Sequence, residues 1–129
     1  MNDVARALLA KASESLESAR ADLGAGRLNG ASNRPYYAMF HAARAALEAR
    51  GAATGGQRHG AVIRRFGLAF VKSGPLEAAH GRNLNKALEI RNEGDYDLEP
   101  PDRDDVVATV GNAAAFVDAV AALLEQHES

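Results

Sequence analysis

The sequence predicts an all-α fold, an antiparallel up-and-down helical bundle of four long helices plus one shorter helix. Hydrophobic residues make up 47% of the 129 residues, enough for one core, and many are alanine, the strongest helix former. Isoleucine is scarce and valine clusters near the C-terminus, so strand propensity is weak. Apolar residues recur at steps of three and four between glycine and proline breaks. No linker divides the chain, so we expect a single domain over residues 1–129.

The first two helices are separated by the glycines of the segment 24–26. The first is expected over residues 2–22, with an apolar stripe of Val4, Leu8, Ala12, Leu16, Ala19 and Leu23. The second is expected to begin near Asn33, because Pro35 lacks an N–H and fits a first helical turn. Asn33 or Arg34 is then its cap, and Gly51 ends it.

The remaining helices follow further glycine and proline breaks. The third is expected over residues 58–72, with Val62, Phe66 and either Ala69 or Phe70 facing the core. The fourth is expected over residues 76–93. The fifth follows the Pro-Pro pair, with Asp102 as its cap and Asp105 as a capping-box-like partner. Its stripe consists of Val106, Val110, Ala113, Val117, Ala121 and Leu124.

Composition excludes several classes of protein. Without cysteine, the chain has no disulfide, thiol nucleophile or cysteine-ligated metal. The N-terminus does not resemble a signal peptide, and no stretch approaches the roughly 20 apolar residues of a membrane span. We therefore expect a cytoplasmic protein with no membrane partner. No phosphate-binding glycine loop or HExxH motif occurs. The four histidines lack metal-site spacing, so no metal or cofactor is expected (His41, His59, His80 and His127).

Charge is distributed unevenly along the chain. Residues 34–91 contain ten basic and three acidic residues, a net of +7, whereas residues 92–129 contain one basic and ten acidic residues, a net of −9. This asymmetry is compatible with an anion-binding face and an acidic tail that masks it or binds a partner. The simpler interpretation is that the helices bring the two signs together in ordinary surface pairs.

Two helices carry polar residues at core-like spacing. In the second helix, Tyr36, Phe40, Ala43 and Leu47 follow a core pattern, and a neighbouring face carries Asn33, Tyr37, His41 and Arg44. In the fourth helix, Arg91 and Asp95 continue the stripe of Leu84 and Leu88. Arg91 should therefore point towards the bundle or a cleft, where it needs a carboxylate, an oligomer partner or a ligand phosphate. Asp95 is the obvious intramolecular partner.

Four segments together resemble the HEPN superfamily, in particular its small stand-alone prokaryotic proteins. They are NRPYYAMFHAA from Asn33, the His59-Gly60 pair, the run from Phe66 to Leu76, and RNEGDY from Arg91 to Tyr96. The resemblance covers roughly residues 28–98. It implies a helical bundle that forms homodimers. It also implies a toxin paired with a minimal nucleotidyltransferase antitoxin.

The resemblance further implies a metal-independent ribonuclease, in which an Arg binds the scissile phosphate and a His a few residues later acts as acid or base. Arg91 and Asn92 match the start of that motif, but Tyr96 occupies the position of the His. Leu98 occupies the position of a Tyr to which some antitoxins attach AMP. His41 could supply the missing imidazole if the second helix crosses beside Arg91.

Three hypotheses follow. In the first, the protein is a toxin-type ribonuclease that uses Arg91, Asn92, Tyr96 and His41 for catalysis across a dimer cleft. Its substrate-binding residues are Asp95, Asn33, Arg34 and Tyr37. In the second, the same cleft binds an adenine nucleotide or docks the nucleotidyltransferase without catalysis. In the third, the polar residues only form a structural hydrogen-bond network.

Overall fold

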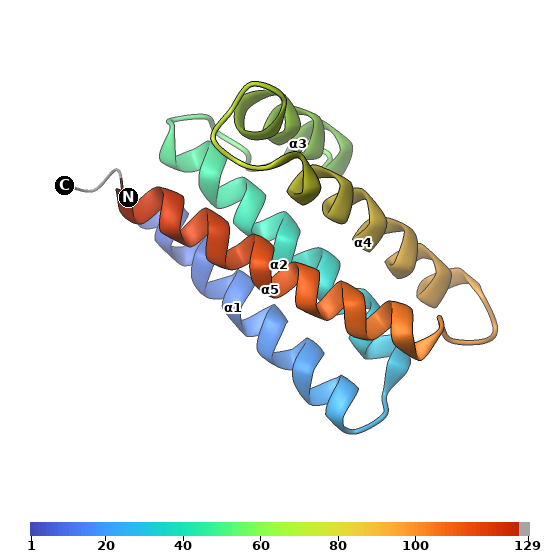
Figure 1. Cartoon of the computed structure of the whole chain (residues 1–129). Helices are drawn as coiled ribbons and strands as arrows, with labels where there is room; N and C mark the ends of the chain where they lie inside the picture. The colour runs from blue at the N-terminus through green and yellow to red at the C-terminus, as the bar shows by residue number, and fades with distance from the viewer. Residues whose placement is uncertain (127–129) are drawn as a thin grey trace.

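The computed structural model describes residues 1–126 as a helical bundle, with no strand in that range. The long helices are α1 (Asp3–Gly24), α2 (Leu28–Ala49), α4 (Ala78–Tyr96) and α5 (Arg103–Gln126). The short helix α3 (His59–Phe66) continues into the π-helical turn η1 (Gly67–Lys72). The long helices run alternately up and down, and α3 crosses one end of the bundle (Figure 1). The predicted all-α helical bundle is confirmed. His127, one of the four histidines, lies outside the described residues.

Helix α2 is the centre of the bundle, because it contacts α1, α3, α4 and α5. The four residues predicted to face the core from it, Tyr36, Phe40, Ala43 and Leu47, are all buried. Alanines at 38, 42, 45 and 46 are also fully buried, and such small side chains let neighbouring helices approach α2 closely. The chain leaves α2 through Gly51, whose φ of 88° is a conformation that favours glycine.

The predicted start of the second helix is wrong. Helix α2 begins at Leu28, with Arg27 at the cap position, so Pro35 lies inside the helix. Proline in a helix interior removes one backbone hydrogen bond, a cost that tertiary packing must offset. Here Ala31, Ser32 and Pro35 are all buried, so the extra turns are held by packing. Asn33 is therefore not a helix cap, and its side chain hydrogen-bonds Asp95 of α4 instead.

Smaller corrections concern which side chains enter the core. In α1, Ala5 is buried and the predicted Val4 is 51% exposed. In α4 the buried face is Leu84, Ala87 and Ile90, a rotation that leaves Leu88 and Arg91 half-buried at its edge. In the third segment Phe70, and not Ala69, is buried, where it stacks on Phe66 at 5.3 Å between ring centroids. Helical periodicity alone does not decide which of two adjacent residues is buried, because the apolar face of a helix is wider than one residue.

Helix caps and the stripe of α5 largely follow the sequence. Asn2 accepts a hydrogen bond from the Ala5 N–H at 2.8 Å at the start of α1. Asp102 caps α5 as predicted, with its Oδ1 2.8 Å from the Asp104 N. Helix α5 is long and apolar enough to cross a membrane, with a mean hydropathy of 1.8 over its most apolar stretch. This corrects the expectation that no stretch approaches the length and apolar character of a membrane span. The apolar stripe of α5 is buried against the other helices, and this packing accounts for the composition.

Candidate functional site

The polar residues of α2 and α4 meet where the two helices pack together. The Asn33 Nδ2 donates to the Asp95 Oδ1 at 3.2 Å, although the two residues lie 62 positions apart in sequence. The other carboxylate oxygen of Asp95 lies 3.4 Å from the Arg91 Nε. The Asp95 carboxylate therefore links α2 to the guanidinium. We call the surrounding group the Arg91 cluster: Asn33, Tyr36, Tyr37, His59, Arg91 and Asp95.

The guanidinium of Arg91 lies against two aromatic rings. Its Cζ is 5.4 Å from the ring centroid of Tyr36 and 5.2 Å from that of Tyr37, within cation–π range. The side chain is 25% exposed, as expected for a residue at the edge of the buried face. Its Nε is fully buried and makes no hydrogen bond, and the Asp95 Oδ2, at 3.4 Å, lies beyond the usual N–H···O distance. Arg91 thus combines partial burial, one long ion pair and a side chain that is still 25% exposed, which suits it to bind an anion.

His59 joins this cluster from the start of α3. Its imidazole stacks on Phe40 at 4.0 Å between centroids, and its Nδ1 lies 3.1 Å from the Tyr36 hydroxyl. Burial lowers the pKa of His59 from 6.5, and the charges of Arg91 and Arg44 lower it further. Burial also raises the pKa of Tyr36 to about 12, so its hydroxyl stays protonated. Sequence reasoning used His59 only for the family resemblance, because no helical spacing relates it to Tyr36.

His41 lies beside the cluster, 6.5 Å from Tyr37 between ring centroids. Its Nδ1 is buried and has no hydrogen-bond partner. Burial lowers the pKa of His41, followed by the charges of Lys11, Arg44 and His59. Both imidazoles are therefore held in the neutral form near neutral pH.

The other predicted site residues lie apart from these contacts. The Arg34 Nε pairs with the Asp22 Oδ2 of α1 at 3.2 Å. Arg27 and Arg34 hydrogen-bond the Asp22 carboxylate and lower its pKa. Asn92 is exposed, and Tyr96 is 82% exposed at the end of α4. Within residues 1–126, no three imidazole or carboxylate side chains converge as a metal site requires.

A buried threonine fixes the loop that leads to His59. Thr54 donates to the Glu48 Oε2 through both its backbone N–H, at 2.6 Å, and its hydroxyl, at 2.7 Å. The Arg44 Nε donates to the same hydroxyl oxygen at 2.9 Å. These bonds from Thr54 lower the pKa of Glu48, with the Arg44 charge contributing less. Helix α2 therefore anchors the loop that places His59.

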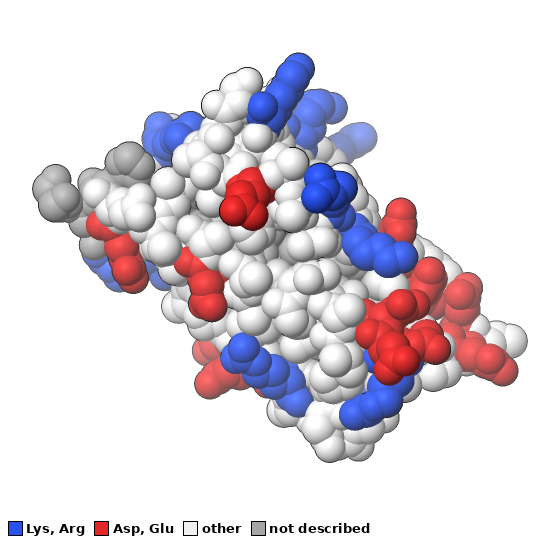
Figure 2. Space-filling model, in the orientation of Figure 1, with Lys and Arg blue, Asp and Glu red and all other residues white. Residues whose placement is uncertain are grey.

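The surface charges remain separated after folding. Acidic side chains gather at the end of the molecule that carries the α4–α5 loop, and basic ones lie over α3 and α4 (Figure 2). The acidic group consists of Glu93, Asp95, Asp97, Glu99, Asp102, Asp104 and Asp105, all exposed. Arg91 and Asp95 form an ion pair at the boundary of the two regions. The Arg91 cluster thus adjoins this acidic group through Asp95.

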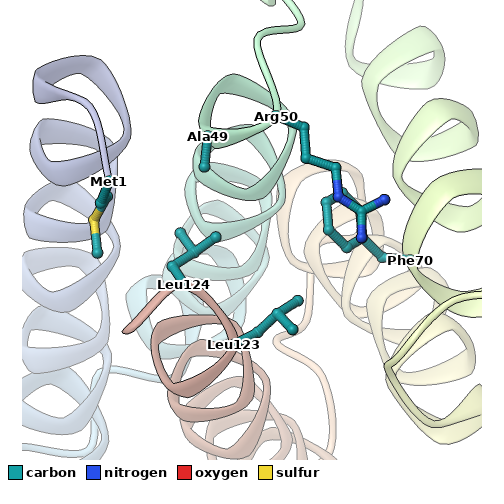
Figure 3. Close-up of a pocket in the computed structure, with 6 residues that line it drawn as sticks. All are labelled: Met1, Ala49, Arg50, Phe70, Leu123 and Leu124. Carbon is teal, nitrogen blue, oxygen red and sulfur yellow. The ribbon is translucent and has the colours of Figure 1, made fainter. Parts of the chain in front are cut away.

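A separate cavity of about 270 Å³ opens at the end of the bundle that holds the N-terminus. Figure 3 shows the Arg50 side chain over the Phe70 ring, with Leu123 and Leu124 opposite. The Arg50 Cζ lies 4.1 Å from the Phe70 ring centroid, and its Nη1 donates to the Ala69 carbonyl at 3.3 Å. Because Arg50 is already engaged and the other lining side chains are apolar, this cavity offers little chemistry beyond apolar contact.

Comparisons with known proteins identify relatives of the chain. The HEPN domain family matches residues 5–124. A protein of Methanocaldococcus jannaschii, named as a "putative toxin", is 31% identical over 121 residues, covering 94% of this chain and 89% of that protein. A UPF0332 protein of Thermotoga maritima is 34% identical over 116 residues, covering 89% and 86%. A UPF0332 protein of Pyrococcus horikoshii is 44% identical over 71 residues, covering 55% and 49%. The family match includes every residue of the Arg91 cluster.

Proposed function

Because the chain belongs to the HEPN domain family, we propose that it is the toxin component of a toxin–antitoxin pair, binding and cleaving RNA at the Arg91 cluster. Similarity to a protein named as a "putative toxin" over most of both chains supports the toxin role. In this proposal the protein acts in the cytoplasm as a homodimer, with the two Arg91 clusters facing a shared cleft. Cleavage needs no metal ion.

The state of Arg91 is the observation that carries this proposal. A guanidinium packed against Tyr36 and Tyr37 is partly shielded from water, so its attraction for a phosphate is stronger than that of a surface lysine. The Arg91 side chain remains 25% exposed, so a phosphate can approach it, and its ion pair with Asp95 is long, at 3.4 Å. Such a group stabilises the negative charge that develops on a phosphate under attack.

The first experiment incubates purified protein with single-stranded RNA in excess EDTA. The wild type is expected to cleave, and Arg91→Ala is expected to lose about 100- to 1,000-fold in rate, the usual effect of removing one charge-stabilising donor. Arg82→Ala is the matched control, because Arg82 is an exposed arginine of the same helix. Equal cleavage by wild type and Arg91→Ala rejects the assignment of the site.

A non-catalytic binding module is the second candidate function. The position where HEPN ribonucleases carry a histidine is Tyr96, which is 82% exposed and whose phenol is a poor base near neutral pH. In this case the Arg91 cluster binds an adenine nucleotide or docks the nucleotidyltransferase. Absence of cleavage, together with a thermal shift by AMP or ATP that Arg91→Ala abolishes, supports this candidate.

The partner is tested separately. A minimal nucleotidyltransferase encoded beside the gene is expected to co-purify with this protein when both are expressed together. Growth arrest on expression of the protein alone, relieved by the neighbouring gene, supports the toxin–antitoxin assignment. Normal growth on expression alone argues against it.

A further inference from the structure

The His59 imidazole and the Arg91 guanidinium both lie near the rings of Tyr36 and Tyr37. The His59 imidazole centroid lies 5.9 Å from the Tyr36 ring centroid and 6.2 Å from that of Tyr37. The corresponding distances for the Arg91 Cζ are 5.4 and 5.2 Å. His59 is exposed, and Arg91 is close enough for its charge to lower the pKa of the imidazole. A cation for phosphate and an imidazole for proton transfer therefore flank the same two rings, although 32 residues of chain separate them.

The Tyr36 hydroxyl holds this imidazole by one nitrogen and leaves the other available. When Nδ1 carries the proton, it donates to the hydroxyl oxygen 3.1 Å away, and Nε2 then keeps its lone pair. After Nε2 takes up a proton, the Nδ1 N–H still donates to the same oxygen. The hydrogen bond to Tyr36 is thus compatible with both protonation states that a general base passes through.

Groups on two helices facing His59 favour its neutral form. Packing of its ring against Phe40 and Tyr36 partly removes water from the imidazole and lowers its pKa from 6.5, and the positive charges of Arg91 on α4 and Arg44 on α2 act in the same direction. The titratable and charged groups that face it are Tyr36, Tyr37, His41 and Arg44 from α2 and Arg91 from α4. None of them is a carboxylate that would stabilise the imidazolium. His59 is therefore ready to accept a proton near neutral pH.

We propose that His59 is the general base for RNA cleavage at the Arg91 cluster, a role that rests on the proposed function. The substrate is RNA with a free 2′-hydroxyl at the cleaved position. The 2′-oxygen attacks the adjacent phosphorus while its proton passes to the His59 Nε2, and the bond from phosphorus to the 5′-oxygen breaks. Water protonates the departing 5′-oxygen, and the hydroxide left behind recovers the proton from His59. The products carry a 2′,3′-cyclic phosphate and a 5′-hydroxyl.

The test measures cleavage rates from pH 5 to 8 in EDTA for the wild type and for His59→Gln, His41→Gln and His80→Gln. The wild-type rate is expected to fall on the acid side with a midpoint below 6.5, because protonation disables the base. His59→Gln is expected to lose about 100- to 10,000-fold and the acid-side fall with it. His80→Gln is the matched histidine control, since His80 packs on Phe116 away from the cluster. Thermal unfolding of each variant confirms that it folds.

The outcomes separate the proposal from its premise. Loss of activity in Arg91→Ala with a wild-type rate and pH profile in His59→Gln overturns the role of His59 and leaves the RNA site standing. Loss of the acid-side fall in His41→Gln, with the fall retained in His59→Gln, assigns the base to His41 instead. No cleavage by the wild type overturns both. Tyr36→Phe should slow cleavage yet keep the acid-side fall, because it removes only the group that orients the imidazole.

Discussion

Gly94 of α4 lies so close to Ser32 of α2 that a Cβ atom at position 94 would overlap the Ser32 Oγ. Arg91 and Asp95 stand on either side of Gly94 in the same helix, and Asp95 reaches across to Asn33 beside Ser32. The small size of Gly94 therefore sets the distance between α2 and α4 at which the Arg91 cluster forms.

Gly94→Ala is expected to destabilise the protein, although alanine has the higher helix propensity. Overpacking costs about 1–3 kcal/mol, which exceeds the gain in propensity of about 1 kcal/mol. Denaturant unfolding measures the difference. In the Ser32→Ala background the obstructing Oγ is absent and the Cβ remains 3.3 Å from the added methyl, so the same Gly94→Ala change should cost clearly less. A destabilisation of equal size in both backgrounds would show that Ser32 is not the obstacle.

Asp95→Asn is expected to strengthen RNA binding. The change removes the counter-ion of Arg91 and retains an oxygen for the Asn33 amide. Stability should change by less than about 1 kcal/mol, because the pair is partly exposed at 25% and 34%. Fluorescence anisotropy with labelled RNA at 50 to 200 mM salt should give a binding slope steeper by about one ion. Glu93→Gln is the control, because it also removes one negative charge from the same helix. An equal gain in RNA affinity in both variants would show that Asp95 has no specific role at the site.

Thr54→Val is expected to loosen the loop that places His59. Valine keeps the shape of the side chain but leaves Glu48 and Arg44 without the hydroxyl, at a cost of about 1–3 kcal/mol. Hydrogen exchange should increase over residues 52–58, and RNA cleavage should fall with it. Thr109→Val serves as the control because its hydroxyl bonds only the Asp105 carbonyl within α5. Unchanged exchange in the loop would contradict the anchoring role of Thr54.

Stability should decline as the pH falls below about 6.5. The folded protein lowers the pKa of His41 and His59, so the unfolded chain binds protons at a higher pH than the folded one. Protonation therefore favours unfolding, and the stabilisation is complete only above the unfolded pKa. The melting temperature should drop between pH 7.5 and 5.5, and the drop should be smaller in the His41→Gln, His59→Gln double variant. An equal drop in melting temperature in the double variant would show that titratable groups other than His41 and His59 cause the pH dependence of stability.

The long helices and much of their core could be predicted because helical periodicity is a local property. Residues three and four apart share a face wherever the helix lies, so Tyr36, Phe40, Ala43 and Leu47 are buried as predicted. The same reasoning placed Asn33, Tyr37, His41 and Arg44 on a half-buried face and turned Arg91 away from free solvent. It failed at Pro35, where the local rule for a first turn was overridden by the burial of Ala31 and Ser32.

The contacts between elements in the Arg91 cluster were decided by tertiary structure, whereas the Arg91–Asp95 pair within α4 was predicted from its spacing. Asn33 contacts Asp95 across 62 positions of sequence, and Tyr36 contacts His59 across 23. The loop between α2 and α3 has no helical periodicity from which the second contact could be predicted. Which side chains meet depends on how closely α2 and α4 cross and on how Thr54 holds that loop. By itself the sequence determined the helices, their buried faces and the inward position of Arg91, because these depend on neighbours within one or two turns. Only the packed bundle brought His59 to the rings beneath Arg91, because that contact depends on the path of the whole chain.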